Sequence, residues 1–382
     1  MQAHHRPIIG YALNAFPCES FADWWTCLNT EVLEIKRRIF PDEVFPIELR
    51  FSEQFLRELT PDRVAQLKTF FAAHGLALVT VNAFVMPHFH GAPVKEQAYL
   101  PAWHASDARL NFTNRCVDLL AELQRPDAPE PKPLSAPMPQ CSSTESESRH
   151  FGTWALATLP SVSVPFGALK PVSLDAVAPN ILKAGEHAAR RGCIVALEPE
   201  PGLCVETTAE VVEFFTRFVP DHLRPHLGVN FDLAHQLVEF EDLTAALELL
   251  RQHAIRVAKI HVSNAAELAD LKPFYTDSIY LHQVTGCDDR GQRIYFSLDW
   301  PTELPPGIAK FRCHYHLPVY PSALPSTLPE VDAFLQKLHS PVPPLIIETY
   351  TWPEQLRGRP HLVDNICREL NWVRERIRLN RH

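Results

Sequence analysis

The feature that most constrains the fold is a repeated alternation of short apolar segments with amphipathic segments of helical periodicity. Eight apolar runs have the length and composition of β-strands: residues 8–13, 45–51, 76–84, 154–159, 193–198, 227–232, 257–262 and 345–349. Strands that alternate with helices form parallel sheets. Eight such strands are the number that closes a barrel, so we predict an α/β protein with a (β/α)8 TIM barrel. A doubly wound open sheet is the alternative, but no G-x-G-x-x-G or P-loop sequence follows a predicted strand.

Local signals mark the ends of the predicted helices. Thr60 can cap a helix whose first turn holds Pro61, and Gly75 stands where that helix should end. Thr207 and Glu210 have the spacing of a capping box, which predicts that another helix begins there. Further helices are predicted at 21–39, 110–123, 174–190, 241–254, 328–338 and 361–379.

Two segments interrupt the alternation within what we otherwise predict to be a single domain, 1–382. Residues 125–150, after the third helix, hold six prolines and the polar run CSSTESES. We predict a flexible insertion there, because such a composition buries too little apolar surface to offset its ordering entropy. Residues 263–322, after the seventh strand, form a longer excursion with strand-like pieces at 279–284, 293–298 and 310–320. We predict an insertion or lid within the barrel.

The composition excludes several classes of function. A formal net charge of -9 argues against binding to nucleic acids or anionic membranes, which require clustered Lys and Arg. The nine cysteines form no C-x-x-C pair, so neither a zinc ribbon nor a disulfide scaffold is predicted. No run of about 20 apolar residues is long enough to span a membrane, and the N-terminus lacks the apolar core of a signal peptide. We therefore expect a cytoplasmic protein without membrane insertion.

Polar side chains end the last four predicted strands. Glu198 ends the fifth strand, Asp232 ends the sixth, His261 stands in the seventh and Glu348 ends the eighth. Active sites of parallel barrels lie at the carboxyl ends of the strands, so we expect these side chains to meet. One acid at a strand end is usually a helix cap or a loop anchor, but four ionisable side chains buried together are costly without a partner. Three carboxylates and an imidazole predict a site for one divalent ion: Mn, Zn, Co, Mg or Fe.

The motifs around these residues are similar to those of a known superfamily. The order Glu–Asp–His–Glu, with a D-x-x-H pair at Asp232 and His235, resembles the xylose isomerase-like TIM barrels, which include sugar isomerases and epimerases. Five motifs resemble more closely its EboE branch, named for metabolite traffic: NAF-x-x-P-x-FHG (82–91), LEPEPG (197–202), FDLAHQ-x-VEFED (231–242), H-x-HLP (314–318) and ETYTW (348–352). The resemblance covers nearly the whole chain except 125–150. It implies a divalent metal and a sugar, polyol or cyclitol-like substrate.

The histidine ligand has two candidate positions. In the sugar epimerases the metal histidine precedes the last glutamate by one helix and one strand, whereas His261 lies 87 residues before Glu348. His314 and His316 lie 34 and 32 residues before Glu348, which is closer to the usual spacing. We favour His261, because its strand follows the preceding helix directly. His314 and His316 are then expected to line the same cavity and bind substrate.

Several other residues are candidates for substrate contacts. His235 lies one helical turn beyond Asp232, and His90 follows the third strand with the less favoured His88. Trp352 offers a surface on which a sugar ring can stack; Tyr350 and Trp103 do so as well, although such aromatic residues more often belong to the core. Glu200 is predicted to be a loop anchor or a hydrogen-bond partner of a ligand.

Three functions are compatible with these predictions. The first is metal-dependent isomerisation or epimerisation of a small polyhydroxylated metabolite, in which Glu198 and Glu348 exchange a proton next to a carbonyl. The second is a metabolite-binding or traffic protein of the Ebo type, which keeps the pocket without turnover. The third, an endonuclease IV-like phosphodiesterase, would need more metal ligands and a basic surface, so the net charge makes it the least favoured.

Overall fold

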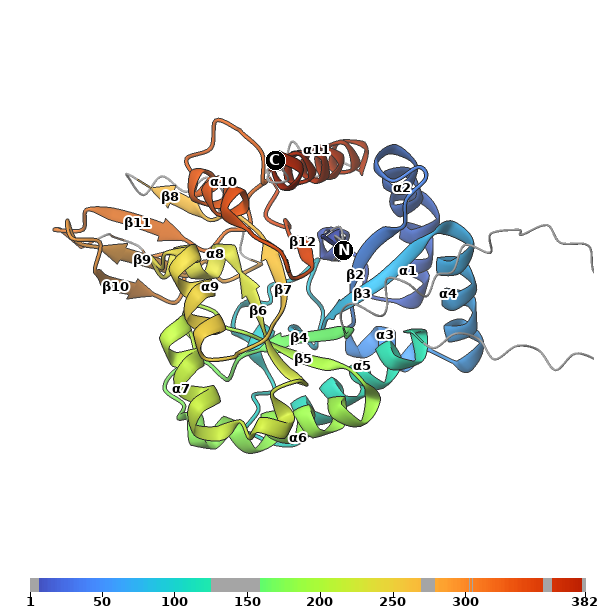
Figure 1. The fold of residues 1–382 in the computed structure, drawn as a ribbon, viewed down its shortest axis with the longest axis horizontal. Helices are drawn as coiled ribbons and strands as arrows, with labels where there is room; N and C mark the ends of the chain where they lie inside the picture. The colour runs from blue at the N-terminus through green and yellow to red at the C-terminus, as the bar shows by residue number, and fades with distance from the viewer. Residues whose placement is uncertain are drawn as a thin grey trace, which may run out of the picture.

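The predicted barrel is present and closed (Figure 1). The computed structural model describes residues 7–124, 159–268, 279–301, 303, 305–352 and 359–379. The barrel strands are β1 Ile9–Ala12, β2 Phe45–Arg50, β3 Leu76–Asn82, β4 Ser161–Pro165, β5 Ile194–Glu198, β6 Leu227–Asp232, β7 Val257–Val262 and β12 Leu345–Ile347. They pair in parallel in the order β1-β12-β7-β6-β5-β4-β3-β2, and β1 also pairs with β2. The (β/α)8 prediction is therefore confirmed, and the open-sheet alternative is wrong.

Helices surround the barrel. They are α1 Phe21–Cys27, α2 Leu33–Ile39, α3 Glu53–Glu58, α4 Pro61–His74, α5 Ala108–Gln124, α6 Leu174–Arg191, α7 Thr208–Phe218, α8 Leu233–Val238, α9 Leu243–Gln252, α10 Leu328–Lys337 and α11 Arg359–Leu379. The predicted end signals of α4 are confirmed, because Thr60 accepts a hydrogen bond from the Arg63 amide and Gly75 adopts a positive φ of 62°. The capping box of Thr207 and Glu210 is also present at the start of α7.

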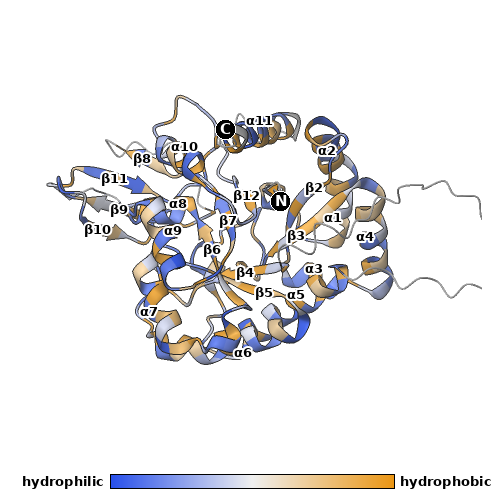
Figure 2. Cartoon of the chain, viewed as in Figure 1, coloured by the Kyte–Doolittle hydropathy of each residue, from blue (hydrophilic) through white to orange (hydrophobic). Residues whose placement is uncertain are grey.

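The helices are amphipathic, and Figure 2 shows hydrophobic and hydrophilic residues interspersed along them. On α6, Val177, Ile181, Ala184 and Ala188 recur at helical spacing and are buried. Within the described ranges, none of the helices combines the length and the apolar character that crossing a bilayer requires.

The fourth strand is displaced from its predicted position. The prediction of 154–159 is wrong, because the barrel strand β4 is Ser161–Pro165; residues 154–158 lie outside the described residues, as does the predicted insertion at 125–150. The sequence SVSVP places polar residues inside the barrel, where the Ser161 hydroxyl donates to Thr80 Oγ1 at 3.0 Å. A search for uninterrupted apolar runs overlooks a strand whose interior positions are serines.

Between β7 and α10 the chain forms a second, antiparallel sheet. Its strands are β8 Ala266–Leu268, β9 Val284–Cys287, β10 Arg293–Ser297 and β11 Lys310–Cys313, in the order β10-β9-β11-β8. The strand predicted at 293–298 is close to β10. The strand predicted at 279–284 lies too early, because β9 begins only at Val284, and the strand predicted at 310–320 is too long, because β11 ends at Cys313. The residues after β11 leave this sheet for the barrel, where the Leu317 amide donates to the Asn264 carbonyl at 2.7 Å, two residues past β7.

Candidate active site

Four side chains converge at the carboxyl ends of neighbouring barrel strands. Glu198, Asp232, His261 and Glu348 come from β5, β6, β7 and the residue after β12, and all four are buried. Nδ1 of His261 lies 2.9 Å from Glu348 Oε2 and 3.4 Å from both Glu198 Oε1 and Asp232 Oδ2. One donor atom from each residue falls within 4.8 Å of the others. The structure thus brings together the four residues that the sequence predicts as ligands.

Two carboxylate oxygens of this cluster lack a hydrogen bond from any residue that the structure describes. Within the described part of the chain, Glu198 Oε2 and Asp232 Oδ2 are buried without a hydrogen bond. A buried carboxylate oxygen left without a donor costs free energy unless a cation or a ligand supplies the missing interaction. Three carboxylates and one imidazole suit Mg²⁺, Mn²⁺ or another divalent ion. The residues present therefore fit such an ion.

Asp232 serves two structural purposes at once. Its Oδ1 caps α8 by accepting from the amides of Ala234 at 2.8 Å and His235 at 3.1 Å, and it also accepts from the Ser263 hydroxyl at 2.6 Å. Burial raises the pKa of this carboxyl, but its electrostatic interactions with His235, His316 and His261 lower the pKa well below its ordinary value. Asp232 is therefore an ionised group. Its Oδ1 accepts three hydrogen bonds, and its Oδ2 faces His261.

His261 is oriented by a buried ion pair that the sequence analysis overlooked. Its Nε2 lies 3.0 Å from Glu48 Oε1 on β2, and the other oxygen of Glu48 pairs with the ammonium of Lys259 on β7. Burial raises the pKa of Glu48, but Lys259 and His261 outweigh it and lower the pKa to about 2. With Nε2 turned to this carboxylate, Nδ1 points at the ligand cluster. The signal in the sequence was an acid and a lysine in the middle of otherwise apolar strands.

Glu348 is also held in place by neighbours. Its Oε1 accepts from the side-chain amides of Asn14 at 2.6 Å and Asn82 at 3.2 Å, which leaves Oε2 facing His261. Burial raises the pKa of Glu348, whereas the charge and hydrogen bond of His261 lower it, and the net direction is downward. Asn82 lies in the NAF motif, but nothing in the sequence singled out Asn14.

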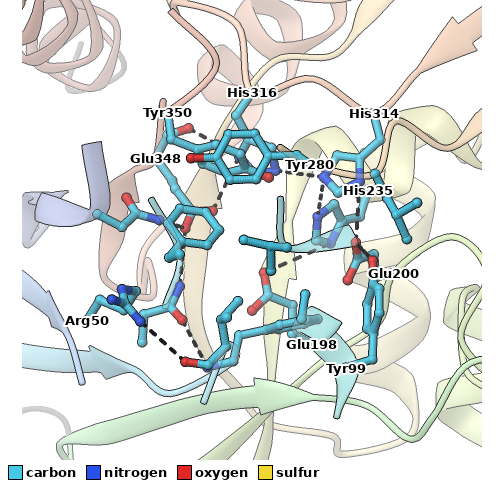
Figure 3. A pocket seen from close by; sticks show the side chains of 18 of the residues that line it. Arg50, Tyr99, Glu198, Glu200, His235, Tyr280, His314, His316, Glu348 and Tyr350 are labelled. Carbon is cyan, nitrogen blue, oxygen red and sulfur yellow. Dashed lines mark hydrogen bonds and ion pairs between the residues drawn. The ribbon is translucent and has the colours of Figure 1, made fainter. Parts of the chain in front are cut away.

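A pocket opens over the two glutamates (Figure 3). Glu198 and Glu348 line it together with imidazoles and with aromatic and other polar side chains: Asn14, Arg50, Asn82, Phe84, Phe89, Tyr99, Glu200, His235, Tyr280, His314, His316 and Tyr350. Glu200 accepts from the Tyr99 hydroxyl at 2.7 Å and from the Gln283 amide at 3.0 Å. Burial raises the pKa of Glu200 to about 7.

The two candidate positions of the histidine ligand separate in space. His261 joins the carboxylates, whereas His314 and His316, which follow β11, lie against His235 of α8 in the pocket wall. The small sheet between β7 and β12 accounts for the long sequence interval between His261 and Glu348.

Two predicted substrate contacts lie elsewhere. His90 and Trp352 line a neighbouring cavity, where His90 Nε2 donates to the Asn14 carbonyl at 2.7 Å and the Trp352 indole donates to the Thr349 carbonyl at 3.0 Å. Trp103 is wholly buried in the core, and His88 is exposed. The pocket therefore takes its aromatic wall from tyrosines and phenylalanines.

Comparisons with known proteins agree with this geometry. The family model described as "Xylose isomerase-like TIM barrel" matches residues 146–291, which contain β4 to β7. The chain has the fold of a xylose isomerase-like TIM barrel. No curated protein sequence matches it.

Solved structures share this xylose isomerase-like barrel over nearly their full length. One is a xylose isomerase domain protein from Planctomyces limnophilus (14% identity, 98% of this chain and 99% of that chain, TM-score 0.52). Another is a xylose isomerase-like TIM barrel protein from Mycobacterium smegmatis in complex with magnesium (14%, 99% and 99%, TM-score 0.51). A third is an L-ribulose 3-epimerase (12%, 99% and 99%, TM-score 0.51). These similarities concern the fold, and they name the wider superfamily rather than the EboE branch.

Proposed function

We propose that the protein is a divalent-metal-dependent isomerase or epimerase that acts on a small polyhydroxylated carbonyl compound, such as a sugar or a cyclitol ketone. The observation that carries this proposal is the convergence of three buried carboxylates and His261, two of whose members, Glu198 and Glu348, line a polar pocket. The L-ribulose 3-epimerase and the magnesium complex with the same fold support it by analogy.

The order of strands separates the two catalytic candidates. The neighbouring strands β12, β7, β6 and β5 supply Glu348, His261, Asp232 and Glu198 in turn, so the two glutamates lie at the ends of this arc. Both line the pocket, whereas Asp232 and His261 are not among its lining residues. A substrate carbon between the glutamates would face one carboxylate on each side.

This placement suits proton exchange next to a carbonyl. A divalent ion at the cluster would polarise the carbonyl and hydroxyl oxygens and stabilise the negative charge that develops when the adjacent proton leaves. Glu198 would accept the proton on one face through a carboxylate that keeps Oε2 without a hydrogen bond in the described chain. Glu348, whose Oε1 is fixed by Asn14 and Asn82, would return a proton on the other face. Tyr280 and Tyr350 would pack against the sugar face.

Deuterium exchange tests the proposal without knowledge of the product. The protein, loaded with diamagnetic Mg²⁺ or Zn²⁺, is incubated in D₂O with ketoses, inososes and related cyclitol ketones, and NMR detects deuterium at the carbon beside the carbonyl. Wild type should exchange, and Glu198→Gln and Glu348→Gln should lose about 10²–10⁴-fold in rate even when enough metal is supplied to saturate their weakened site. Glu213→Gln on the exposed face of α7 is the control and should exchange like wild type.

Tight binding of a compound without deuterium exchange would contradict the isomerase proposal. If the metal-loaded protein binds one of these compounds tightly but incorporates no deuterium from any of them, the isomerase proposal is wrong. The pocket would then serve a metabolite-binding or traffic protein.

A further inference from the structure

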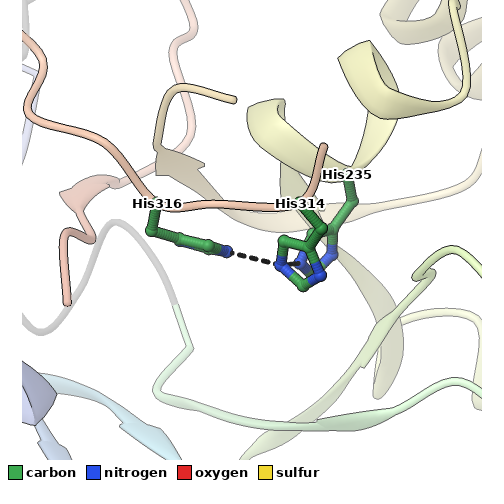
Figure 4. A group of neighbouring side chains, drawn as sticks. All are labelled: His235, His314 and His316. Atoms are coloured by element: carbon green, nitrogen blue, oxygen red, sulfur yellow. Dashed lines mark hydrogen bonds between the residues drawn. The ribbon is translucent and has the colours of Figure 1, made fainter. Parts of the chain in front are cut away.

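A second group of ligand atoms lies in the pocket wall, apart from the carboxylate cluster. His235 of α8 and His314 and His316 after β11 are buried, and their imidazoles point toward one another (Figure 4). Nε2 of His314 lies 3.0 Å from Nε2 of His235 and 3.0 Å from Nε2 of His316. All three residues offer a nitrogen within 4.8 Å of the others.

The opposite nitrogen of each ring faces an oxygen that accepts hydrogen bonds. Nδ1 of His235 lies 2.9 Å from the Pro199 carbonyl, and Nδ1 of His316 lies 3.4 Å from the Glu348 carbonyl. Nδ1 of His314 lies 2.7 Å from Gln283 Oε1. The Gln283 amide nitrogen is directed at Glu200 Oε1 and the Pro201 carbonyl, so its oxygen is the atom left to face His314. Each Nδ1 therefore carries the ring's hydrogen.

This assignment leaves three bare nitrogens facing one another. A neutral imidazole has one N–H, so a ring that donates through Nδ1 presents only a lone pair at Nε2. Two lone pairs 3.0 Å apart repel, and the Nε2 atoms have no other hydrogen-bond partner in the described chain. A proton added to Nε2 of His235 or of His316 would remove the repulsion in only one of the two contacts with His314. A cation between the three nitrogens relieves both.

The geometry and the ligand type favour zinc. Zn–N bonds of about 2.0–2.1 Å in a tetrahedron place the nitrogens about 3.4 Å apart, so each of the two 3.0 Å contacts of His314 would widen by only a few tenths of an ångström. Imidazole suits Zn²⁺, whereas carboxylates suit Mg²⁺ and Mn²⁺. Hydrogen bonds from the far nitrogens to carbonyl or carboxylate oxygens are also the usual support of zinc-binding histidines.

We propose that His235, His314 and His316 form a second cation site, which takes Zn²⁺ through three imidazole nitrogens and keeps its fourth position open to an oxygen ligand in the pocket. The site borders the carboxylate cluster, since His316 Nδ1 lies 3.3 Å from Glu348 Oε2 and His235 Nδ1 lies 3.9 Å from Glu198 Oε1. It does not depend on the proposed isomerase activity, because its ligands are distinct from the four residues of the first cluster.

Metal stoichiometry tests the second site. Chelator-treated protein is titrated with Zn²⁺, and bound zinc is measured after desalting. Wild type should retain two ions per chain, and His314→Phe should retain one. His226→Phe is the matched control, because His226 is a half-buried histidine that bonds to the Cys193 carbonyl away from the pocket, and this variant should retain two.

A second variant leaves all three histidines in place. Glu198→Gln should weaken the first site and keep one zinc ion, and X-ray absorption at the zinc edge should show a first shell dominated by imidazole nitrogens. This result does not depend on the folding of a histidine variant. A wild-type protein that retains only one ion, or a remaining ion in Glu198→Gln without imidazole ligands, overturns the second site. Failure of deuterium exchange alone overturns only the isomerase proposal.

Discussion

At the scale of single residues, Glu48 contacts the proposed metal ligand His261 without belonging to the cluster of four residues. Its carboxylate orients His261 and neutralises Lys259, and both partners are fully buried. Carboxylates that support a ligating histidine in this way raise its basicity, and their loss typically lowers metal affinity about 10–100-fold.

Removing this charge should therefore weaken metal binding although all four ligands remain. Glu48→Gln alone would leave Lys259 as an unpaired buried charge, which is strongly destabilising, so the variant to make is Glu48→Gln with Lys259→Met. We expect it to fold and to bind divalent metal about 10–100-fold more weakly by titration calorimetry. An affinity equal to that of wild type would show that Glu48 does not support His261 as a ligand.

At the scale of secondary-structure elements, the sequence predicted what local patterns determine. Seven barrel strands and most of the surrounding helices follow apolar runs, caps and periodicity, which depend on neighbours in the chain; the short helices α3 and α8 were not predicted. β4 was misplaced because its serines interrupt the apolar run; they bond to Thr80 on the neighbouring strand β3 and to Lys259 of β7 across the barrel. The four convergent side chains were found because they stand at strand ends, whereas Glu48 stands mid-strand and its purpose depends on a partner 211 residues away.

The histidine assignment shows the same limit. Sequence spacing could not separate His261 from His314 and His316, because the interval depends on a small antiparallel sheet whose strands are short and irregularly spaced. Only the three-dimensional arrangement shows that His314 and His316 lie with His235, while His316 Nδ1 also lies 3.3 Å from Glu348 Oε2.

The cap of α7 permits a test of one such local signal. Thr207 accepts from the Glu210 amide, and Glu210 reaches back to the Thr207 amide at 2.9 Å. Thr207→Ala should lower the free energy of unfolding by about 1 kcal/mol, seen as a lower thermal midpoint. Thr216→Ala, at an exposed position of the same helix, should leave the midpoint unchanged or slightly higher, because alanine favours helix. Equal effects of the two substitutions would contradict a contribution from the cap.

At the scale of the whole molecule, metal binding should stabilise the barrel. The ligands come from four strands, so an ion that binds only the folded chain shifts the unfolding equilibrium by about 2.7 kcal/mol at a hundredfold excess over its Kd. Mn²⁺ or Zn²⁺ added to chelator-treated protein should therefore raise the thermal midpoint. The double variant Glu198→Gln with His314→Phe should show little increase. A midpoint in wild type that does not respond to any of the candidate ions would contradict the first metal site.

The last helix, α11, packs at the seam between β1 and β12, where the first and last barrel strands pair. A buried acid of this helix, Glu369, lies at the seam. It accepts from the Tyr11 hydroxyl of β1 at 2.7 Å, from the Thr349 hydroxyl after β12 at 2.6 Å, and from the Val319 amide at 3.0 Å. Burial raises the pKa of Glu369 to about 7, although these three donors lower it. The folded protein therefore binds this proton more tightly than the unfolded chain, whose carboxyl titrates near its ordinary value.

The stability that this proton contributes should be lost as the pH rises. It is fully present below the pKa of the unfolded chain, about 4.3, and disappears as the pH approaches the folded value of about 7. A difference of that size corresponds to at most about 3–4 kcal/mol. Glu369→Gln carries no charge at any pH, so its thermal midpoint relative to wild type should rise between pH 5 and pH 8. Glu213→Gln, exposed on α7, should show no such trend, and a pH-independent difference for Glu369→Gln would mean that Glu369 is ionised at the seam throughout this range.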